Sequence, residues 1–502
     1  MSQRQYTKIL RNREARIARR LSRRNWKARA KPMMSATSIR YEMSGRIEGI
    51  GCGGIGAIHQ LAQGVGLVDG LNRRLRLLRR HSPYFESDHI LNIAYNVLAG
   101  GQCLEDIEFR RQDAVFLNAL GTCVIPDPTT AGDFTRRFAQ SDIETMMDCI
   151  NESRRVVWRH SGRAPFEEAL VDIDGTIAPT CGECKQGMEY SYKQVWGYHP
   201  LVISLANTGE VLFLENRPGN VASHQGAVER IDQTIALLRP DALRICLRGD
   251  TGFFLTQHFD RWSDQVDFVF GMDAHKKAVE LAQALPEQAW RLLKRQPKYQ
   301  AQTQKRRKPE NVKDRIVCQR EFEKIRLDCE HVAEFTYRPG KCTKDYRVVV
   351  CRKDLSIEKG QEVLFHEYRY FFYITTRWDL TAAQVVELAN RRCNQENVIE
   401  QLKNGVNAMR MPVDNLLSNW AYMVMAALAW NLKAWFAMLV PDRESSTQLL
   451  RMEFRQFLNS VIRISCQIVR TGRRIIYRVL AYNAWLRDFL LTWEKIRQLK
   501  PA

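Results

Sequence analysis

The stretch LANRRCNQENVIEQLKNG, residues 388–405, belongs to a segment that no Gly or Pro interrupts between residues 381 and 404. Its apolar residues mostly recur at spacings of three and four, which predicts a helix. Asp379 or Thr381 can cap the N-terminus of this helix, and Gly405 can end it. We therefore expect one long helix over this segment.

Three charged residues on this helix stand at positions i, i+4 and i+11, namely Arg392, Glu396 and Lys403. With 3.6 residues per turn, their side chains project from one face. Taken alone, such a triplet is most often a solvated charged face. Two segments earlier in the chain favour a functional interpretation instead.

Each of these segments ends a short apolar strand with a carboxylate. Residues 168–176, EALVDIDGT, contain Asp172 and Asp174, which share one face of a strand because they stand two apart. Residues 243–254, LRICLRGDTGFF, lead to Asp250. In open α/β sheets, sites form at the carboxyl ends of strands. Each Asp alone could simply cap a turn, but two such strands followed by the charged helix indicate a site.

The three segments resemble the acidic motifs of bacterial insertion-sequence DDE transposases, and most closely the group called thirteen-eighty. Further matches are GYHPL at 197–201, RPGN at 217–220, residues 408–412 followed by Asn419, and LAWNL at 428–432. The resemblance runs from about residue 51 to the C-terminal end. One departure is Ala389, because many relatives carry Tyr at this position, three residues before the Arg.

The resemblance implies an α/β fold with an RNase H-like mixed-sheet catalytic core, interrupted by a β-rich insertion before the last acid. It also implies a catalytic triad of three acids with two supporting basic residues: Asp174, Asp250, Glu396, Arg392 and Lys403. Asp172 is the alternative first acid. We prefer Asp174 because it directly precedes Gly-Thr.

Three carboxylates at one sheet edge repel one another, and two Mg²⁺ ions about 4 Å apart would offset this repulsion. We expect Asp174 to bridge the ions, with Asp250 on one and Glu396 on the other. All-oxygen ligands favour Mg²⁺ over zinc, with Mn²⁺ as a substitute. The expected reaction is cleavage of a phosphodiester at a transposon end, followed by attack of the freed 3′-OH on target DNA.

The composition agrees with a nucleic-acid partner. The chain has 502 residues, of which 45% are apolar and 26% charged, and a formal charge of +20. Such an excess indicates a polyanionic partner, and we expect double-stranded DNA: the terminal inverted repeats and the target. A homodimer on DNA is expected because two ends must be paired. Thirteen scattered Cys and the lack of a signal peptide predict a reducing bacterial cytoplasm, with the protein associated with the nucleoid.

The order of composition along the chain predicts six regions. They are a basic, disordered arm (1–45), a helical DNA-binding domain (46–160), the first half of the core (161–283), a β-rich insertion with a basic loop (284–365), the second half of the core (366–440) and a basic helical C-terminal region (441–502). The arm is assigned from twelve Lys and Arg against Glu14 within residues 1–31.

Three basic groups are candidates for DNA contact. The first lies on a capped helix that could belong to a helix-turn-helix, the second in the basic loop of the insertion and the third on the C-terminal basic face. The residues are Arg136 and Arg137; Lys305, Arg306, Arg307 and Lys308; and Arg473 and Arg474. Each could also be an ordinary solvated charge.

Two further motifs point elsewhere only weakly. Cys181 and Cys184 form a lone C-x-x-C, which without a second pair is poor support for zinc or redox chemistry. The apolar stretch 416–439 is long enough to span a membrane. Polar Asn431 and Lys433 within it favour a buried helix instead, so no membrane partner is expected.

The sequence therefore predicts a DNA transposase, a metal-dependent polynucleotidyl transferase and endonuclease. One alternative is a catalytically inactive, transposase-derived DNA-binding protein. Another is a metal-dependent DNA nuclease without strand transfer. A membrane protein is the most distant alternative.

Overall fold

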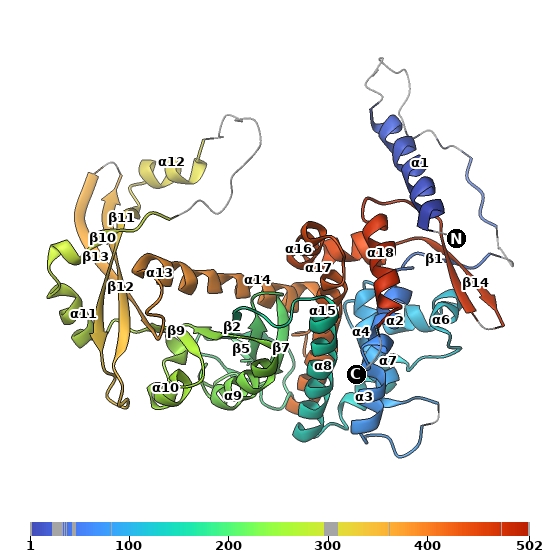
Figure 1. The fold of residues 1–502 in the computed structure, drawn as a ribbon, viewed down its shortest axis with the longest axis horizontal. Helices are drawn as coiled ribbons and strands as arrows, with labels where there is room; N and C mark the ends of the chain where they lie inside the picture. The colour runs from blue at the N-terminus through green and yellow to red at the C-terminus, as the bar shows by residue number, and fades with distance from the viewer. Residues whose placement is uncertain are drawn as a thin grey trace.

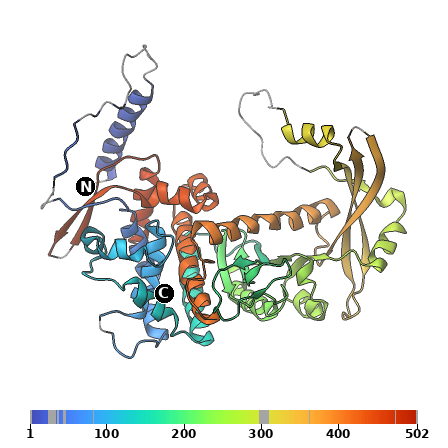
Figure 2. The same cartoon turned by 180° about the vertical axis from the view of Figure 1, so that it is seen from behind.

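The computed structural model describes residues 3–22, 34, 36, 38–42, 47–81, 83–295, 310–360, 362–472 and 474–499. Figure 1 shows an elongated molecule with a central sheet, a helical block at one end and, at the other end, a β arm that strands β10, β11, β12 and β13 form (bounds below). The helical block joins the N-terminal helices to the C-terminal elements, which lie side by side in both views (Figures 1 and 2). The expected mixed α/β class with a large mixed sheet is confirmed.

One nine-stranded sheet organises the fold, in the order β10-β11-β12-β13-β9-β8-β2-β6-β7. Only the β2–β8 and β8–β9 pairings are parallel. The strands are β2 (Ala169–Gly175), β6 (Leu201–Leu205), β7 (Glu210–Glu215), β8 (Ile245–Gly249), β9 (Asp267–Met272), β10 (Arg291–Leu292), β11 (Glu323–Tyr337), β12 (Tyr346–Lys359) and β13 (Glu362–Thr375). A small sheet in the order β3-β5-β4 follows β2, with β3 (Ala178–Pro179), β4 (Glu189–Tyr190) and β5 (Trp196–Tyr198).

Helices cover both faces of the central strands, which explains why β6 and β8 are buried along their whole length. Figure 1 shows α13 and α14 on one side of these strands, with α9 and α10 on the other. The bounds are α9 (Ala227–Leu238), α10 (Thr256–Ser263), α11 (Lys276–Gln283), α12 (Val312–Gln319), α13 (Ala382–Asn390) and α14 (Asn394–Glu400). Short 3-10 turns lie at Arg239–Asp241 (η1), Thr251–Phe253 (η2), Glu287–Ala289 (η3) and Arg391–Cys393 (η4), and a π turn at Gln401–Gly405 (η5).

The predicted insertion is built on long antiparallel strands, but it is not a separate sheet. β13 pairs with β9, so β10–β13 continue the sheet of the core. The predicted boundary at residues 365 and 366 falls inside β13 and is therefore misplaced. The physical reason is that a long strand can leave one structural region and enter another without a turn to mark the change.

The predicted buried helix over 416–439 is α15 (Leu416–Met438), whose residues from Ser418 to Met438 are all buried. Its Asn431 side chain exchanges two hydrogen bonds with the backbone of Val211 in edge strand β7, at 2.9 and 3.1 Å. The Asn431 amide thus satisfies the backbone N–H and C=O of Val211, which no neighbouring strand pairs with at this edge of the sheet. Among the described residues, no helix is long and apolar enough to cross a membrane.

The N-terminal region, which the sequence predicts as a helical DNA-binding domain, contains helices between residues 55 and 160, and its DNA binding stays a prediction. Its helices are α2 (Ile55–Gly64), α3 (Leu67–Arg74), α4 (Glu86–Leu98), α5 (Ile107–Arg111), α6 (Ala114–Leu120), α7 (Pro128–Thr135) and α8 (Gln140–His160). The prediction of a disordered arm is wrong for α1 (Gln3–Leu21), because Arg, Gln, Leu and Ala are good helix formers even without an apolar face. Arg13 Nη1 of α1 donates to Ala481 O at 3.3 Å, which ties the helix to the C-terminal region.

The C-terminal region is only partly helical, so that prediction needs correction. Between α16 (Arg443–Arg451), α17 (Phe454–Phe457), the π turn η6 (Leu458–Ile462) and α18 (Leu486–Ile496) lies a hairpin of β14 (Cys466–Thr471) and β15 (Arg474–Val479). β-branched residues such as Ile468 and Val469 favour strands, and burial along β14 alternates at first with period two. β14 also pairs with β1 (Gly49–Ile50), which joins the two ends of the chain.

Candidate active site

Asp172 is a buried structural carboxylate. In the parallel register of β2 and β8 it lies beside Arg248, and both of its oxygens accept hydrogen bonds from this guanidinium, at 2.7 Å from Nε and 2.9 Å from Nη2. Burial raises the pKa of Asp172 to about 6, and Arg248 opposes the shift. Arg248 also donates to Leu388 O at 3.1 Å. With both oxygens engaged and 1% of its surface exposed, Asp172 is a poor candidate for the first acid.

Asp174 and Asp250 stand two positions farther along the same two strands. Because Asp172 and Arg248 are register partners, Asp174 and Asp250 are placed beside each other at the carboxyl ends of β2 and β8. Burial raises the pKa of Asp174, and the negative charge of Asp250 raises it further. Asp250 accepts from Gly252 N at 2.9 Å and so caps the turn η2. Its capping role and its position at the site are therefore compatible.

The charged helix lies across these strand ends. It begins with Thr381, which accepts from Gln384 N in a capping box, as one of the two predicted caps. Arg392 Nη1 donates to Asp174 Oδ2 at 2.9 Å. Burial would lower the pKa of Arg392, but the charges of Asp174 and Asp250 outweigh it and raise the pKa. The guanidinium thus partly neutralises the pair of aspartates.

Gln395 fixes the helix to the sheet. Its Nε2 donates to Asp172 O at 2.9 Å and to Val202 O at 3.0 Å, so α14 is held against both β2 and β6. Glu396 is the next residue; its side chain is exposed and makes no hydrogen bond or ion pair within the described part of the chain. The third predicted acid is therefore carried by an anchored helix, with its carboxylate free.

Lys403 lies in the π turn η5 that continues α14. Burial lowers its pKa, while the charges of Glu400 and Asp174 raise it. π turns within helices are frequent at functional sites, and the sequence predicted an uninterrupted α-helix here. The turn changes which residues share a face after Glu400, yet Lys403 remains within electrostatic reach of Asp174.

The structure thus brings Arg392 into electrostatic contact with both Asp174 and Asp250, and Lys403 into electrostatic contact with Asp174. The three predicted acids do not form one tight cluster. Over the described ranges, the only group of three or more His, Cys, Asp or Glu with ligand atoms all within 4.8 Å is Cys329, His331 and Asp354. The spacing of the acids excludes a single ion held by all three in this conformation.

Two residues next to Asp174 were missed as site candidates. His199 is buried, and its Nδ1 lies 2.7 Å from Val221 O, which leaves Nε2 to face Gly175. A Cβ on Gly175 would come within 2.8 Å of this Nε2 and 3.4 Å of Arg217 Nη2. Arg217 Nη2 is buried without a hydrogen-bond partner in the described structure, and burial lowers the pKa of Arg217 to about 10. The signal was present in GYHPL and RPGN, two motifs of the family resemblance.

The predicted DNA-contact residues have different surroundings. Arg136 forms ion pairs with Asp133 and Asp414. Arg137 is exposed and lines a surface hollow of about 710 Å³, together with Leu77, Leu78, Arg79, Arg80, Tyr84, His89, Thr130, Asp133 and Phe134. Arg474 is exposed at the start of β15. Lys305, Arg306, Arg307, Lys308 and Arg473 lie outside the described residues. Cys181 and Cys184 are free, exposed thiols.

The sheet and its charged edge define a mixed α/β protein with adjacent aspartates under a helix that presents Arg392 to them. The chain belongs to the DDE transposases: the family model "Transposase DDE domain group 1" matches residues 32–501. DDE transposases cut and join DNA and use divalent metal ions. The resemblance to DDE transposases is thus confirmed at the level of the family.

A solved structure is also similar to this chain. It is the cryo-EM structure of a piggyBac transposase synaptic complex with hairpin DNA, with a TM-score of 0.34 and 11% identity. The match covers 82% of this chain and 81% of the other. A comparison with curated protein sequences gave no match.

Proposed function

We propose that this protein cleaves DNA at the ends of a bacterial insertion sequence of the thirteen-eighty group and transfers the freed strands into target DNA. The observation that carries the proposal is the position of Asp174 and Asp250, which directly follow the last register pair of β2 and β8, Ile173–Gly249, with Arg392 bonded to Asp174. In a member of the DDE transposase family, two such carboxylates are suited to phosphodiester chemistry.

The donor set fits divalent cations. Asp174, Asp250 and Glu396 offer only carboxylate oxygens, the ligands that Mg²⁺ prefers. Burial and the charge of Asp250 raise the pKa of Asp174, so the ionised form of this carboxyl group is destabilised. A bound cation would stabilise that ionised form. A pair of such ions would allow the acids to be more widely spaced than the ligands of one ion. When bound, such ions activate water and stabilise the leaving 3′ oxygen.

The chain's own residues then have separate tasks. Arg392 holds Asp174 in position through its 2.9 Å hydrogen bond and offsets the local negative charge. Gln395 anchors the helix that carries Glu396. Lys403, half-buried beside this site, can bind a DNA phosphate. Asp172 and Arg248 hold β2 and β8 together through their buried ion pair and take no part in the reaction.

An RNase H-like core is supported by the order of elements. Strands β2, β6 and β7 are antiparallel neighbours, β8 and β9 then add in parallel on the other side of β2, and a later helix carries Glu396. The two aspartates lie at the ends of β2 and β8, where a mixed sheet of this order would place its site.

Double-stranded DNA is the proposed partner, bound by a homodimer in the bacterial cytoplasm at the nucleoid. The formal charge of +20 favours a polyanion. The exposed Arg137 and the hollow that it lines supply one basic surface on the N-terminal helices. Pairing of two DNA ends is the reason to expect two copies.

The test uses the full chain with supercoiled DNA that carries the sequences flanking its own coding region, in Mg²⁺ or Mn²⁺. Glu396→Gln should bind this DNA with unchanged affinity and fail to cut it. Glu387→Gln is the matched control, because Glu387 is exposed on α13 and, among the residues that the structure describes, pairs only with Arg391. Metal-dependent cleavage by Glu396→Gln would refute the triad. Cleavage of any DNA without joining of ends would support the nuclease alternative instead.

A further inference from the structure

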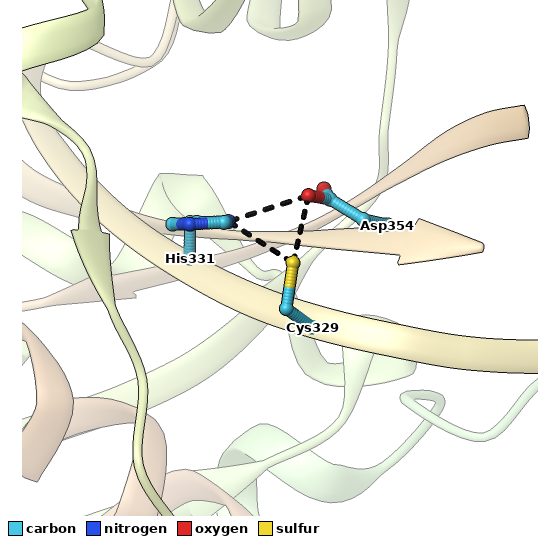
Figure 3. Close-up of side chains that lie close together, drawn as sticks. All are labelled: Cys329, His331 and Asp354. Carbon is cyan, nitrogen blue, oxygen red and sulfur yellow. Dashed lines mark hydrogen bonds and ion pairs between the residues drawn. The ribbon is translucent and has the colours of Figure 1, made fainter.

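A second cluster of ligand-type side chains lies on the β arm, away from the carboxylate edge. Cys329 and His331 are on β11 and Asp354 is on β12, and Figure 3 shows the three side chains converging on one point. All three are half-buried. Neither the family assignment nor the proposed reaction uses them.

The distances between the ligand atoms suit a single soft metal ion. Cys329 Sγ lies 3.0 Å from Asp354 Oδ2 and 3.8 Å from His331 Nδ1, and Nδ1 lies 3.5 Å from the same Oδ2 (Figure 3). A tetrahedral zinc ion, with its usual bonds to sulfur, nitrogen and oxygen, would separate such atoms by about 3.3–3.6 Å. The triangle therefore needs only small adjustments to hold zinc.

The backbone of the arm builds this triangle. Cys329 is the register partner of Asp354, and the ladder has a bulge between Leu327 and Cys329. His331 follows Cys329 by two residues, so both side chains lie on one face of β11. A bulge typically re-aims side chains beside it. Without it, the residue opposite Asp354 would change and the cluster would be lost.

A nucleophilic triad is a poorer interpretation of the same residues. A Cys–His–Asp relay uses one ring nitrogen for the thiol and the other for the carboxylate. Here both neighbours face the same nitrogen, His331 Nδ1. A metal ion between the three residues would take one atom from each of them, so it needs only Nδ1 of His331. The arrangement therefore suits a metal site better than a relay.

Asp354 has further capacity for a cation. Its Oδ1 is buried and has no hydrogen-bond partner within the described residues. The nearest charge is Arg352 Nε at 3.5 Å, but this guanidinium is already paired with Glu287 and lies over the rings of Trp290 and Tyr368, at 4.5 and 5.0 Å. Arg352 thus shares its charge between Glu287 and Asp354, and Asp354 Oδ1 keeps no hydrogen bond within the described residues.

We propose that Cys329, His331 and Asp354 bind one Zn²⁺ ion, with water in the fourth position. The ion would link β11 to β12 at the bulge and stiffen the arm at this point. Sulfur and nitrogen ligands distinguish it from the all-oxygen edge at Asp174, so Mg²⁺ should not compete for it. The proposal is independent of the proposed reaction.

The test is titration of chelator-treated full-length protein with Co²⁺ and then Zn²⁺, in saturating Mg²⁺. One equivalent of Co²⁺ should produce thiolate-to-cobalt charge-transfer absorption, and Zn²⁺ should abolish it. Cys329→Ser should remove this absorption. Cys318→Ser is the matched control, since Cys318 is a half-buried thiol of the same arm that contacts Gly360 O. A Cys181→Ser/Cys184→Ser variant controls for the exposed C-x-x-C.

His331→Gln and Asp354→Asn keep the test decisive if Cys329→Ser does not fold. Each should weaken Co²⁺ binding at least about tenfold, because even outer ligands of metal sites have effects of that size. Unchanged absorption in these variants, or its loss in the Cys181→Ser/Cys184→Ser variant, would overturn the proposal. Absence of any stoichiometric binding would do the same.

Discussion

The two halves of the nine-stranded sheet share one hydrogen-bonded ladder but have different surroundings. In the core half, helices cover both faces, and β6 and β8 are buried throughout. In the arm, β11, β12 and β13 contain 15, 14 and 14 residues, and their outer ends expose apolar side chains such as Ile325, Val363 and Phe365. Continuity of a sheet therefore does not imply a common environment for its side chains.

The difference changes what the same ion pair does. Asp172–Arg248 in the core and Arg338–Asp345 in the arm are both bidentate, with hydrogen bonds of 2.7–2.9 Å. The core pair is buried and the arm pair is about half exposed. Burial makes a broken pair costly, whereas water replaces the lost partner at the surface.

The largest effect should come from Asp172→Ala. It leaves the buried Arg248 without its carboxylate and should lower the free energy of unfolding by roughly 3–5 kcal/mol. Asp345→Ala, the exposed counterpart, should leave the thermal midpoint unchanged. Thermal unfolding of both variants at one scan rate measures the contrast, and equal losses would show that burial does not separate the two halves.

Asp250→Asn should act on the reaction and not on the fold. Asn can still accept from Gly252 N and cap η2, so the melting temperature should be preserved. Loss of a carboxylate ligand of the metal should slow DNA cleavage by at least about 100-fold, since loss of even the outer partners of metal ligands costs about 10–100-fold. Asp264→Asn, an exposed carboxylate paired with Lys344, should cut at the wild-type rate; a slow Asp264→Asn and a fast Asp250→Asn would reverse the assignment.

Arg392→Gln should change the pH dependence of cleavage. Burial raises the pKa of Asp174 and Arg392 opposes this, so removing Arg392 raises the pKa further. The ionised carboxylate would then form only at higher pH, which moves the acid limb of the pH–rate profile to higher pH. At neutral pH the rate should fall about 10–100-fold, as for loss of a group that orients a metal ligand.

The pH–rate profile of Lys403→Gln provides the comparison. Lys403 acts on Asp174 through charge alone. The acid limb of the Lys403→Gln profile should therefore also move to higher pH, but by a smaller amount than that of Arg392→Gln. An unchanged acid limb in Arg392→Gln would show that Asp174 does not limit the rate.

The smallest effects separate the two ends of the arm itself. Val349 on β12 is fully buried and Val363 on β13 is 50% exposed. The change to Thr keeps the shape and adds a hydroxyl, which should cost about 1–3 kcal/mol at the buried position and less than about 0.5 kcal/mol at the exposed one. Unfolding in urea compares the two variants, and similar losses would mean that the outer ends of the strands are covered in solution.

Much of the candidate site was predictable because it depends on local patterns. Apolar strands ending in Asp174 and Asp250, and a capped helix with Arg392 and Glu396, follow from residue spacing and cap chemistry. The buried helix at 416–439 was likewise identified by its polar residues. The sequence also contained the clue to Asp172, since Arg248 precedes Asp250 by two residues just as Asp172 precedes Asp174.

Patterns misled where a strand and a helix compete for similar residues. The C-terminal Arg-rich segment was predicted as helical, and it contains the β14–β15 hairpin. α1 was predicted as disordered because it lacks an apolar face. Neither error affects the carboxylate edge, which is formed by other segments.

By itself, the sequence determined the strands, the helices and the residue types at the candidate site, because these depend on neighbours along the chain. Tertiary structure decided which aspartate is sequestered, since only the pairing of β2 with β8 places Arg248 against Asp172. It also decided that the arm continues the core sheet and that Cys329, His331 and Asp354 meet. Register, burial and the resulting electrostatics arise from contacts between distant segments, and no local pattern contains them.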